Sequence, residues 1–206
     1  MAIALQRFTV DGKAGQLEGL VHMPDDIPCA LAVVAHPLPT MGGNMDNKVA
    51  VTLAKTFAEM GCVAVRFNFR GVGTSEGEFT GGEGEEQDMV DVVHYAQEQF
   101  GEELPLLLSG FSFGGYVAAR AALRLKPQHL ILAAPAVGRF AMPAVSPDTL
   151  VIHGEHDDVV PLADALDWAR PQHLPIVVLP QAEHFFHGRL TQLRDIVKRH
   201  FSGVEL

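Results

Sequence analysis

The sequence lacks the features that mark several special classes of protein. Its 206 residues contain two cysteines, Cys29 and Cys62, too few for a disulfide framework. No stretch approaches the roughly 18 uninterrupted apolar residues that span a bilayer. The N-terminus, MAIALQRFTV, has neither the basic segment nor the long apolar segment of a signal peptide. These absences predict a cytoplasmic protein that does not associate with membranes.

Positive charge is also scarce. Lysine and arginine number 15 against 25 aspartates and glutamates, which gives a net charge of −10. Because nucleic acids and anionic membrane surfaces repel such a chain, we expect neither as a partner. The length, with 48% hydrophobic residues, predicts one domain over residues 1–206. The oligomeric state stays open, with a homodimer as one option.

Short apolar runs alternate with segments of helical spacing. The runs are nearly continuous in apolar character, as in strands buried on both faces of a parallel sheet. We expect strands at 30–36, 62–69, 104–111, 129–135, 149–154 and 175–180, and helices around 49–57, 89–100, 116–125, from 161, and 190–201. Ahead of them, residues 3–10 and 16–24 flank Asp11-Gly12 and predict a hairpin antiparallel to the sheet edge. This alternation indicates a mainly parallel α/β sheet.

Glycine is abundant, and its 20 copies concentrate after the predicted strands. Residues 110–114 read G-F-S-F-G, between the strand at 104–111 and the helix at 116–125. A nucleophile elbow needs this strand–turn–helix setting, because small residues two before and two after the serine let strand and helix pack closely. The pattern therefore predicts Ser112 as a nucleophile.

A serine nucleophile needs a base and an acid that orients the base. In proteins with this elbow the chain order is serine, acid, histidine. Asp157 and Asp158 follow the strand at 149–154, and His184 and His187 follow the strand at 175–180. From the order alone, Asp157 and Asp158 are both candidates for the acid, and His184 and His187 are both candidates for the base.

Four segments resemble the α/β-hydrolase superfamily, and more narrowly a group of small bacterial hydrolases without a lid that is related to dienelactone hydrolases. They are H-P-L-P at 36–39 with G-G-N-M-D-N-K-V at 42–49, F-N-F-R-G-V-G-T-S-E-G at 67–77, G-F-S-F-G-G at 110–115, and H-G-E-H-D-D-V-V-P at 153–161. The resemblance covers nearly the whole chain. It implies a mostly parallel sheet of about eight strands with an antiparallel leading hairpin, helices on both faces and no lid domain. It favours Asp157 as the acid and His184, in an H-F-F segment, as the base.

Two backbone N–H groups are expected to form an oxyanion hole. One belongs to Phe113, the residue after the nucleophile, and the other to the loop after the strand at 30–36. Pro37 and Pro39 have no N–H, so Leu38 is the expected loop donor. Related sequences often have a second histidine where this chain has Leu38, a departure that matters little for a backbone donor.

These residues predict a serine hydrolase that cleaves a small soluble ester through an acyl-enzyme, with no cofactor and no metal. The connection at 135–147 has 13 residues, too few for a lid, and we expect Arg139, Phe140 and Met142 in it to line a pocket wall. The same residues would also suit a thioesterase, a lactonase or a small peptidase. A non-catalytic binding module on this scaffold is the alternative from another class.

Several other residues have rival interpretations. A zinc site can be assembled from two His-x-x-His spacings, 153/156 and 184/187, with Asp157, although each pair lies in a predicted loop. We instead expect His36 and His153 to support loops. The acidic, glycine-rich stretch at 71–88 lacks a dinucleotide fingerprint, because Glu76 stands where glycine belongs. We interpret it as a structural loop with Arg70 at its base.

Overall fold

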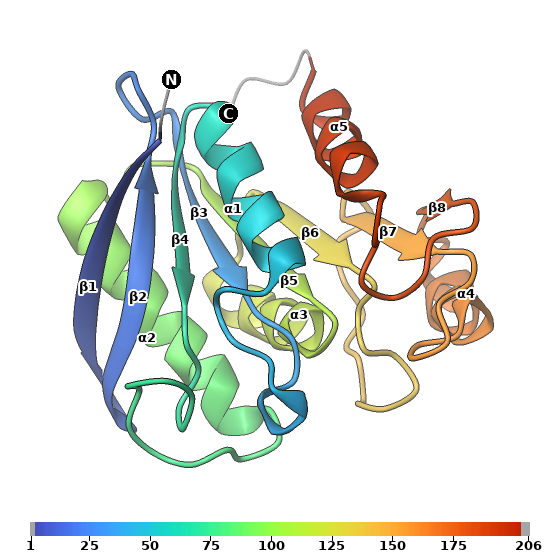
Figure 1. Ribbon diagram of the computed structural model, residues 1–206, viewed down its shortest axis with the longest axis horizontal. Coiled ribbons are helices and arrows are strands. Elements are labelled where there is room, and N and C mark those ends of the chain that lie inside the picture. Colours follow the sequence, from blue (N-terminus) through green and yellow to red (C-terminus); the bar gives the residue numbers. More distant parts are fainter. Residues whose placement is uncertain (1–2, 203–206) are drawn as a thin grey trace.

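The computed structural model describes residues 3–202, and its centre is one eight-stranded sheet (Figure 1). The strands are β1 (Ala4–Gly12), β2 (Gly15–Met23), β3 (Ala30–Ala35), β4 (Cys62–Phe67), β5 (Leu106–Phe111), β6 (His129–Ala133), β7 (Leu150–Gly154) and β8 (Ile176–Leu179). The helices are α1 (Lys48–Glu59), α2 (Glu83–Phe100), α3 (Phe113–Leu125), α4 (Leu162–Ala169) and α5 (Leu190–His200), with 3-10 turns at Pro39–Met41 and Arg170–Gln172. The strand order is β1-β2-β4-β3-β5-β6-β7-β8.

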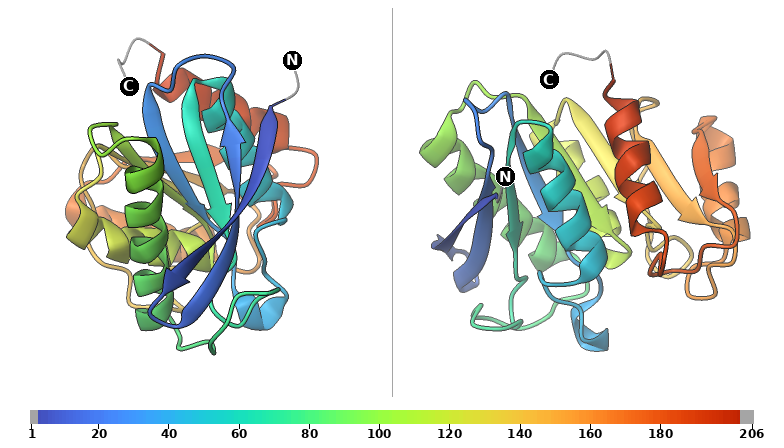
Figure 2. Two further views of the ribbon diagram at one scale, coloured as in Figure 1. Left: turned by 90° about the vertical axis from the view of Figure 1, so that its left-hand side faces the viewer. Right: turned by 45° about the horizontal axis from the view of Figure 1, so that its top comes forward.

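The leading hairpin extends one edge of the sheet, as expected. Strand β1 pairs antiparallel with β2, and β2 pairs antiparallel with β4, whereas all later pairs are parallel. The hairpin lies in front in the left view of Figure 2. The predicted turn at Asp11-Gly12 is wrong, because β1 continues through Gly12 and the chain turns at residues 13–14. The left-handed backbone falls on Gly15 (φ +110°) instead.

Helices cover both faces of the sheet. Helices α1 and α5 pack on one face, and α2, α3 and the end of α4 pack on the other. Every residue of the central strands β3, β4 and β5 is buried. This explains why these strands read as continuous apolar runs rather than as alternating ones.

Helix α2 begins at Glu83 instead of near residue 89, so the stretch predicted as a loop at 71–88 is partly helical. The Glu85 carboxylate accepts hydrogen bonds from the N–H groups of Gly82 (2.6 Å) and Thr80 (2.9 Å). Acidic side chains also suit the positive end of a helix dipole. The acidic run that suggested a loop is therefore the start of the helix.

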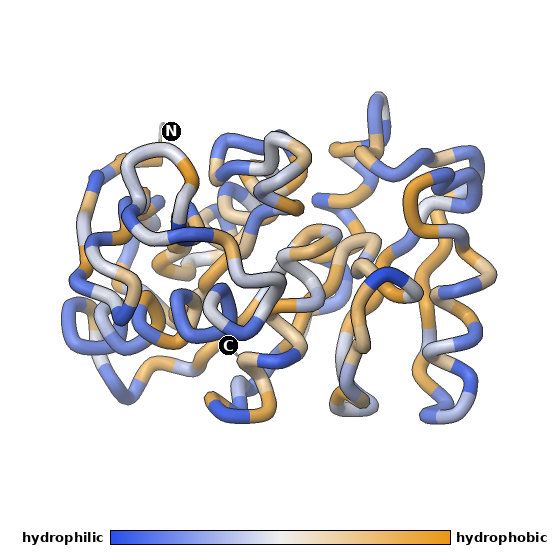
Figure 3. The backbone as a smooth tube through the Cα atoms, turned by 90° about the horizontal axis from the view of Figure 1, so that it is seen from below, coloured by the Kyte–Doolittle hydropathy of each residue, from blue (hydrophilic) through white to orange (hydrophobic). Residues whose placement is uncertain are grey.

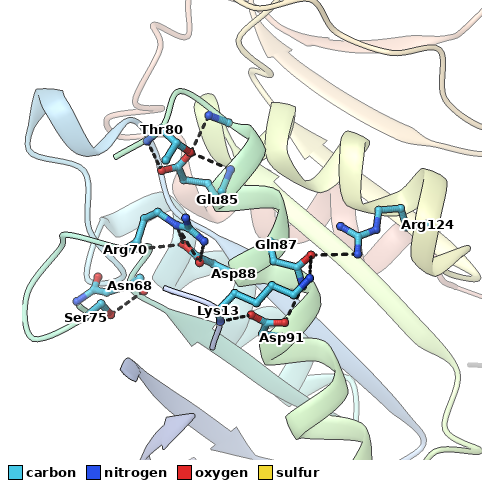
Figure 4. A network of polar contacts seen from close by, with 12 residues as sticks. Lys13, Asn68, Arg70, Ser75, Thr80, Glu85, Gln87, Asp88, Asp91 and Arg124 are labelled. Atoms are coloured by element: carbon cyan, nitrogen blue, oxygen red, sulfur yellow. Dashed lines mark hydrogen bonds and ion pairs between the residues drawn. The ribbon is translucent and has the colours of Figure 1, made fainter. Parts of the chain in front are cut away.

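Arg70 lies at the base of this loop, as expected. Its guanidinium donates three hydrogen bonds to Asp88 on α2, from Nε to both carboxylate oxygens at 3.0 Å and from Nη2 to Oδ1 at 2.6 Å (Figure 4). Its backbone N–H donates to Oδ2 of the same carboxylate at 2.9 Å. Arg70 thereby ties the start of the loop after β4 to the second turn of α2.

The parallel strands β3 and β4 point toward the lower edge of the sheet in Figure 1, the edge that faces the viewer in Figure 3. The loops after β3, β5, β7 and β8 therefore meet there. The β6–β7 connection at 134–149 contains no helix. Within residues 3–202, no helix is both long and apolar enough to cross a bilayer. Cys29 and Cys62 are free thiols, and burial raises the pKa of Cys62 to about 12.

Candidate active site

Ser112 occupies a strained turn between β5 and α3. Its φ of +56° lies in the left-handed region that residues with side chains rarely adopt. A Cβ atom at Gly110 would lie 2.1 Å from the carbonyl oxygen of Gly114, and one at Gly114 would lie 2.3 Å from that of Ala35. Neither position has room for a side chain, which is why the turn needs glycine on both sides of the serine.

A chain of hydrogen bonds joins the serine to a histidine and an aspartate. The distance from His184 Nε2 to Ser112 Oγ is 3.0 Å, and that from His184 Nδ1 to Asp157 Oδ2 is 2.7 Å. All three residues are buried, with exposed fractions of 8% for Ser112, 2% for His184 and 5% for Asp157. Because Nδ1 faces a carboxylate, it carries the proton and leaves Nε2 free to accept one from the serine.

Two further hydrogen bonds orient Asp157. Its Oδ1 accepts from the N–H groups of Val159 (3.0 Å) and Val160 (2.7 Å). Burial raises the pKa of this carboxyl, but the bonds from His184 and Val160 outweigh burial and leave the pKa below its ordinary value. The group beside His184 is therefore a carboxylate at neutral pH.

The alternative acid and base lie away from this chain of hydrogen bonds. Asp158 is exposed, and the exposed His187 has its Nδ1 2.8 Å from Glu183 Oε1. Among residues 3–202, no group of three or more histidine, cysteine, aspartate or glutamate side chains is arranged to hold a metal ion. The structure thus brings together Ser112, His184 and Asp157.

Two buried histidines support the loops, as the sequence suggested. His36 Nε2 accepts the N–H of Phe69 (3.1 Å) while Nδ1 faces the carbonyl oxygen of Pro37 (2.7 Å), and burial lowers its pKa to about 4. His153 Nε2 lies 2.8 Å from the carbonyl oxygen of Val160 and 3.4 Å from Asp157 Oδ2. Burial lowers the pKa of His153 as well. The second contact, with Asp157, was not anticipated from the sequence.

The two expected oxyanion donors lie on the same cavity as Ser112 and His184. This cavity has a volume of about 330 Å³ and includes both Leu38 and Phe113 in its wall. Neither N–H has an acceptor among the residues that the structure describes. The Leu38 carbonyl accepts from the N–H groups of Met41 and Gly43 at 3.1 and 3.0 Å, which fixes the loop. Both groups are thus free to donate to a bound molecule.

The cavity wall is mostly apolar. Its larger apolar side chains are Leu38, Met41, Phe113, Phe140, Val159 and Phe185. Arg139 and Phe140 line it, as predicted, but Met142 does not and packs against the core instead. A more open hollow of about 700 Å³ shares Gly42 and Gly43 with the cavity but contains none of the three hydrogen-bonded residues.

A lidless sheet of this order, with a serine elbow beside a histidine at its carboxyl edge, defines an α/β serine hydrolase. The comparisons agree with this class. The chain belongs to the family described as serine aminopeptidase, S33, whose model matches residues 40–146, just over half of its length.

Relatives match the chain over nearly its full length. The uncharacterised protein RP471 of Rickettsia prowazekii (strain Madrid E) is 30% identical over 95% of this chain and 88% of its own. XC6422 of Xanthomonas campestris, an α/β serine hydrolase without a lid, is 37% identical with a TM-score of 0.91 over 98% of this chain and 95% of its own. An α-β serine hydrolase homologue of Coxiella burnetii is 35% identical with a TM-score of 0.85 over 97% and 98%.

Proposed function

We propose that the protein cleaves small esters, with Ser112 as the nucleophile, His184 as the general base and Asp157 as the residue that orients the histidine. The observation that carries this proposal is the hydrogen-bonded chain from Ser112 Oγ through His184 to Asp157, which opens onto a cavity. A serine hydroxyl is a weak nucleophile until such a base accepts its proton.

The geometry suits acyl transfer in two steps. Ser112 Oγ attacks the ester carbonyl carbon while His184 Nε2 takes the hydroxyl proton, and the N–H groups of Phe113 and Leu38 stabilise the oxyanion. His184 then gives that proton to the leaving alkoxide, which leaves an acyl group on Ser112. A water molecule, deprotonated by His184, attacks this acyl group and releases the acid.

The size of the cavity favours short substrates. About 330 Å³ lies at the lower end of the range for ligand pockets, and the wall is mostly apolar. Thioesters, lactones and short peptides remain alternatives on the same residues, and the family is described as serine aminopeptidase. We still predict an ester substrate, a cytoplasmic location and a single domain. We also predict that nucleic acids are not partners, with a homodimer as one option.

A fluorophosphonate probe tests the nucleophile directly. We expect one covalent adduct per chain on Ser112, because the probe phosphonylates a serine that a neighbouring base activates. Intact-mass and peptide mass spectrometry measure the adduct. Ser112→Ala should abolish it, and the control variant Ser146→Ala, at an exposed serine, should keep it. A folded protein that takes up no label would overturn the proposal and favour a binding module.

The oxyanion loop yields a second prediction, because the proposed donor is the backbone of Leu38 and not its side chain. We expect Leu38→Ala to change kcat by less than about tenfold, whereas Leu38→Pro removes the N–H and lowers kcat by about 10²–10³-fold. Proline fits the observed φ of −54° at this position. Steady-state kinetics on a short 4-nitrophenyl ester measure both. A large loss in folded Leu38→Ala, or full activity in Leu38→Pro, would contradict a backbone donor here.

A further inference from the structure

The cavity beside Ser112 has one side chain of permanent charge in its wall. Arg139 belongs to the β6–β7 connection, is exposed, and forms no hydrogen bond or ion pair with the described residues through its guanidinium. Most other arginines contact a carboxylate; these are Arg66, Arg70, Arg120, Arg124, Arg170 and Arg194. Arg7, Arg189 and Arg199 also form no ion pair with the described residues, but they lie outside this cavity, so Arg139 is the arginine that brings an uncompensated charge to the candidate site.

Within the described part of the chain, the cavity wall contains no carboxylate that could neutralise the charge of Arg139. Asp157 lies behind His184 and already accepts hydrogen bonds on both oxygens. Asp164 lies close to Gly138, since a Cβ atom placed on that glycine would be 2.9 Å from Asp164 Oδ2. Asp164 nevertheless forms no ion pair with Arg139. The cavity therefore combines an apolar wall with a single cation whose partner is left for a ligand.

We infer that Arg139 binds a carboxylate of the substrate, so that the preferred ester carries a second, negatively charged carboxyl group close to the bond that is cleaved. The inference rests on the proposed function and specifies its substrate class. A guanidinium binds a carboxylate through two parallel N–H donors, and partial removal of water strengthens the attraction. The net charge of −10 repels anions at long range, so this preference must arise from a local contact.

The limited volume of the cavity sets the distance between the two groups. A wall that encloses about 330 Å³ leaves room for a short chain between the ester and the carboxylate. Monoesters of short dicarboxylic acids fit this description, with the free carboxylate on the acyl part of the ester. Acetate esters formed on the hydroxyl group of a hydroxybenzoic acid also fit it, with the free carboxylate on the alcohol part. The two arrangements share one recognition chemistry and differ in which part of the substrate reaches Arg139.

Two matched pairs of esters test the inference. On the acyl side, 4-nitrophenyl hydrogen glutarate is compared with neutral 4-nitrophenyl pentanoate. On the alcohol side, 4-acetoxybenzoate is compared with its neutral methyl ester. For each pair the measurement is the ratio of kcat/KM for the anionic ester to that for the neutral one, in the wild type, Arg139→Gln and Arg139→Lys. Arg199→Gln, at an exposed arginine on α5 outside the cavity, is the control.

We expect Arg139→Gln to lower this ratio about tenfold in at least one pair, since a partly exposed charged hydrogen bond contributes about a factor of ten. Arg139→Lys should give an intermediate ratio, and Arg199→Gln should leave it unchanged. The wild-type ratio should also fall as NaCl is added, because salt screens the contact. If Arg139→Gln leaves the ratio unchanged in both pairs, the inference is wrong.

Failure of the proposed function would be recognised separately. Titration calorimetry of the glutarate and pentanoate esters with Ser112→Ala, and with the same variant carrying Arg139→Gln, needs no turnover. Weaker binding of the anionic ester to the double variant supports the contact with Arg139 even if no catalysis is found. If the anionic ester binds the double variant as tightly as it binds Ser112→Ala, the contact with Arg139 is overturned.

Discussion

We expect the replacement of Asp157 with asparagine to lower kcat on a short ester by about 10⁴-fold. The oxygen at the Oδ1 position accepts two backbone N–H groups, from Val159 and Val160, and only the carbonyl of an asparagine amide can do so. The amide NH₂ must therefore face His184 Nδ1. Since NH₂ donates, it selects the tautomer with the proton on Nε2, and that nitrogen no longer accepts the proton of Ser112.

The neighbouring residue supplies the matched control. Asp158 lies in the same loop but is exposed, so Asp158→Asn should change kcat by less than about twofold. Steady-state kinetics, with circular dichroism to establish folding, measure both variants. A folded Asp157→Asn enzyme that keeps more than about a tenth of the wild-type kcat would contradict the proposed orientation of His184, as would an equal loss in Asp158→Asn.

The sequence predicted the fold well where burial is uniform. Strands β3, β4 and β5 are covered on both faces, so selection for apolar residues acts on every position and leaves a continuous run. The serine turn was equally predictable, because close contacts of Gly110 and Gly114 with backbone atoms exclude side chains. In both cases a local physical requirement restricts the residue type.

Elsewhere the requirement involves residues that are distant in sequence. The hairpin turns at 13–14, two residues later than Asp11-Gly12 suggested, and the N–H of Lys13 donates to Asp91 on α2 at 2.9 Å. Asp157 and Asp158 are the same residue type in one loop, and the order of residues alone does not distinguish them, whereas in the fold Asp157 is buried against His184 and Asp158 is exposed. The contact between His153 and Asp157 and the unpaired guanidinium of Arg139 likewise depend on how separate loops meet.

The buried pair Arg70–Asp88 yields the largest predicted effect on stability. Asp88 is fully buried and Arg70 nearly so, with side-chain exposed fractions of 0% and 12%. We expect Arg70→Met to lower the free energy of unfolding by about 3–5 kcal/mol, because it leaves a buried carboxylate without its cation. Urea denaturation at neutral pH measures this change. The control variant Arg194→Met breaks a half-exposed pair with Asp195 and should cost less than about 1 kcal/mol.

The pH dependence and a double variant separate charge from lost packing. Burial raises the pKa of Asp88, and hydrogen bonds from Arg70 only partly offset it. In Arg70→Met the pKa rises further, so the folded state takes up a proton at a higher pH than the unfolded chain. The deficit in stability should therefore be largest at neutral pH and shrink as the pH falls through this raised pKa. Adding Asp88→Leu should restore much of the loss, because no buried charge remains. If the double variant is no more stable than Arg70→Met, the cost arises from packing and not from the unpaired carboxylate.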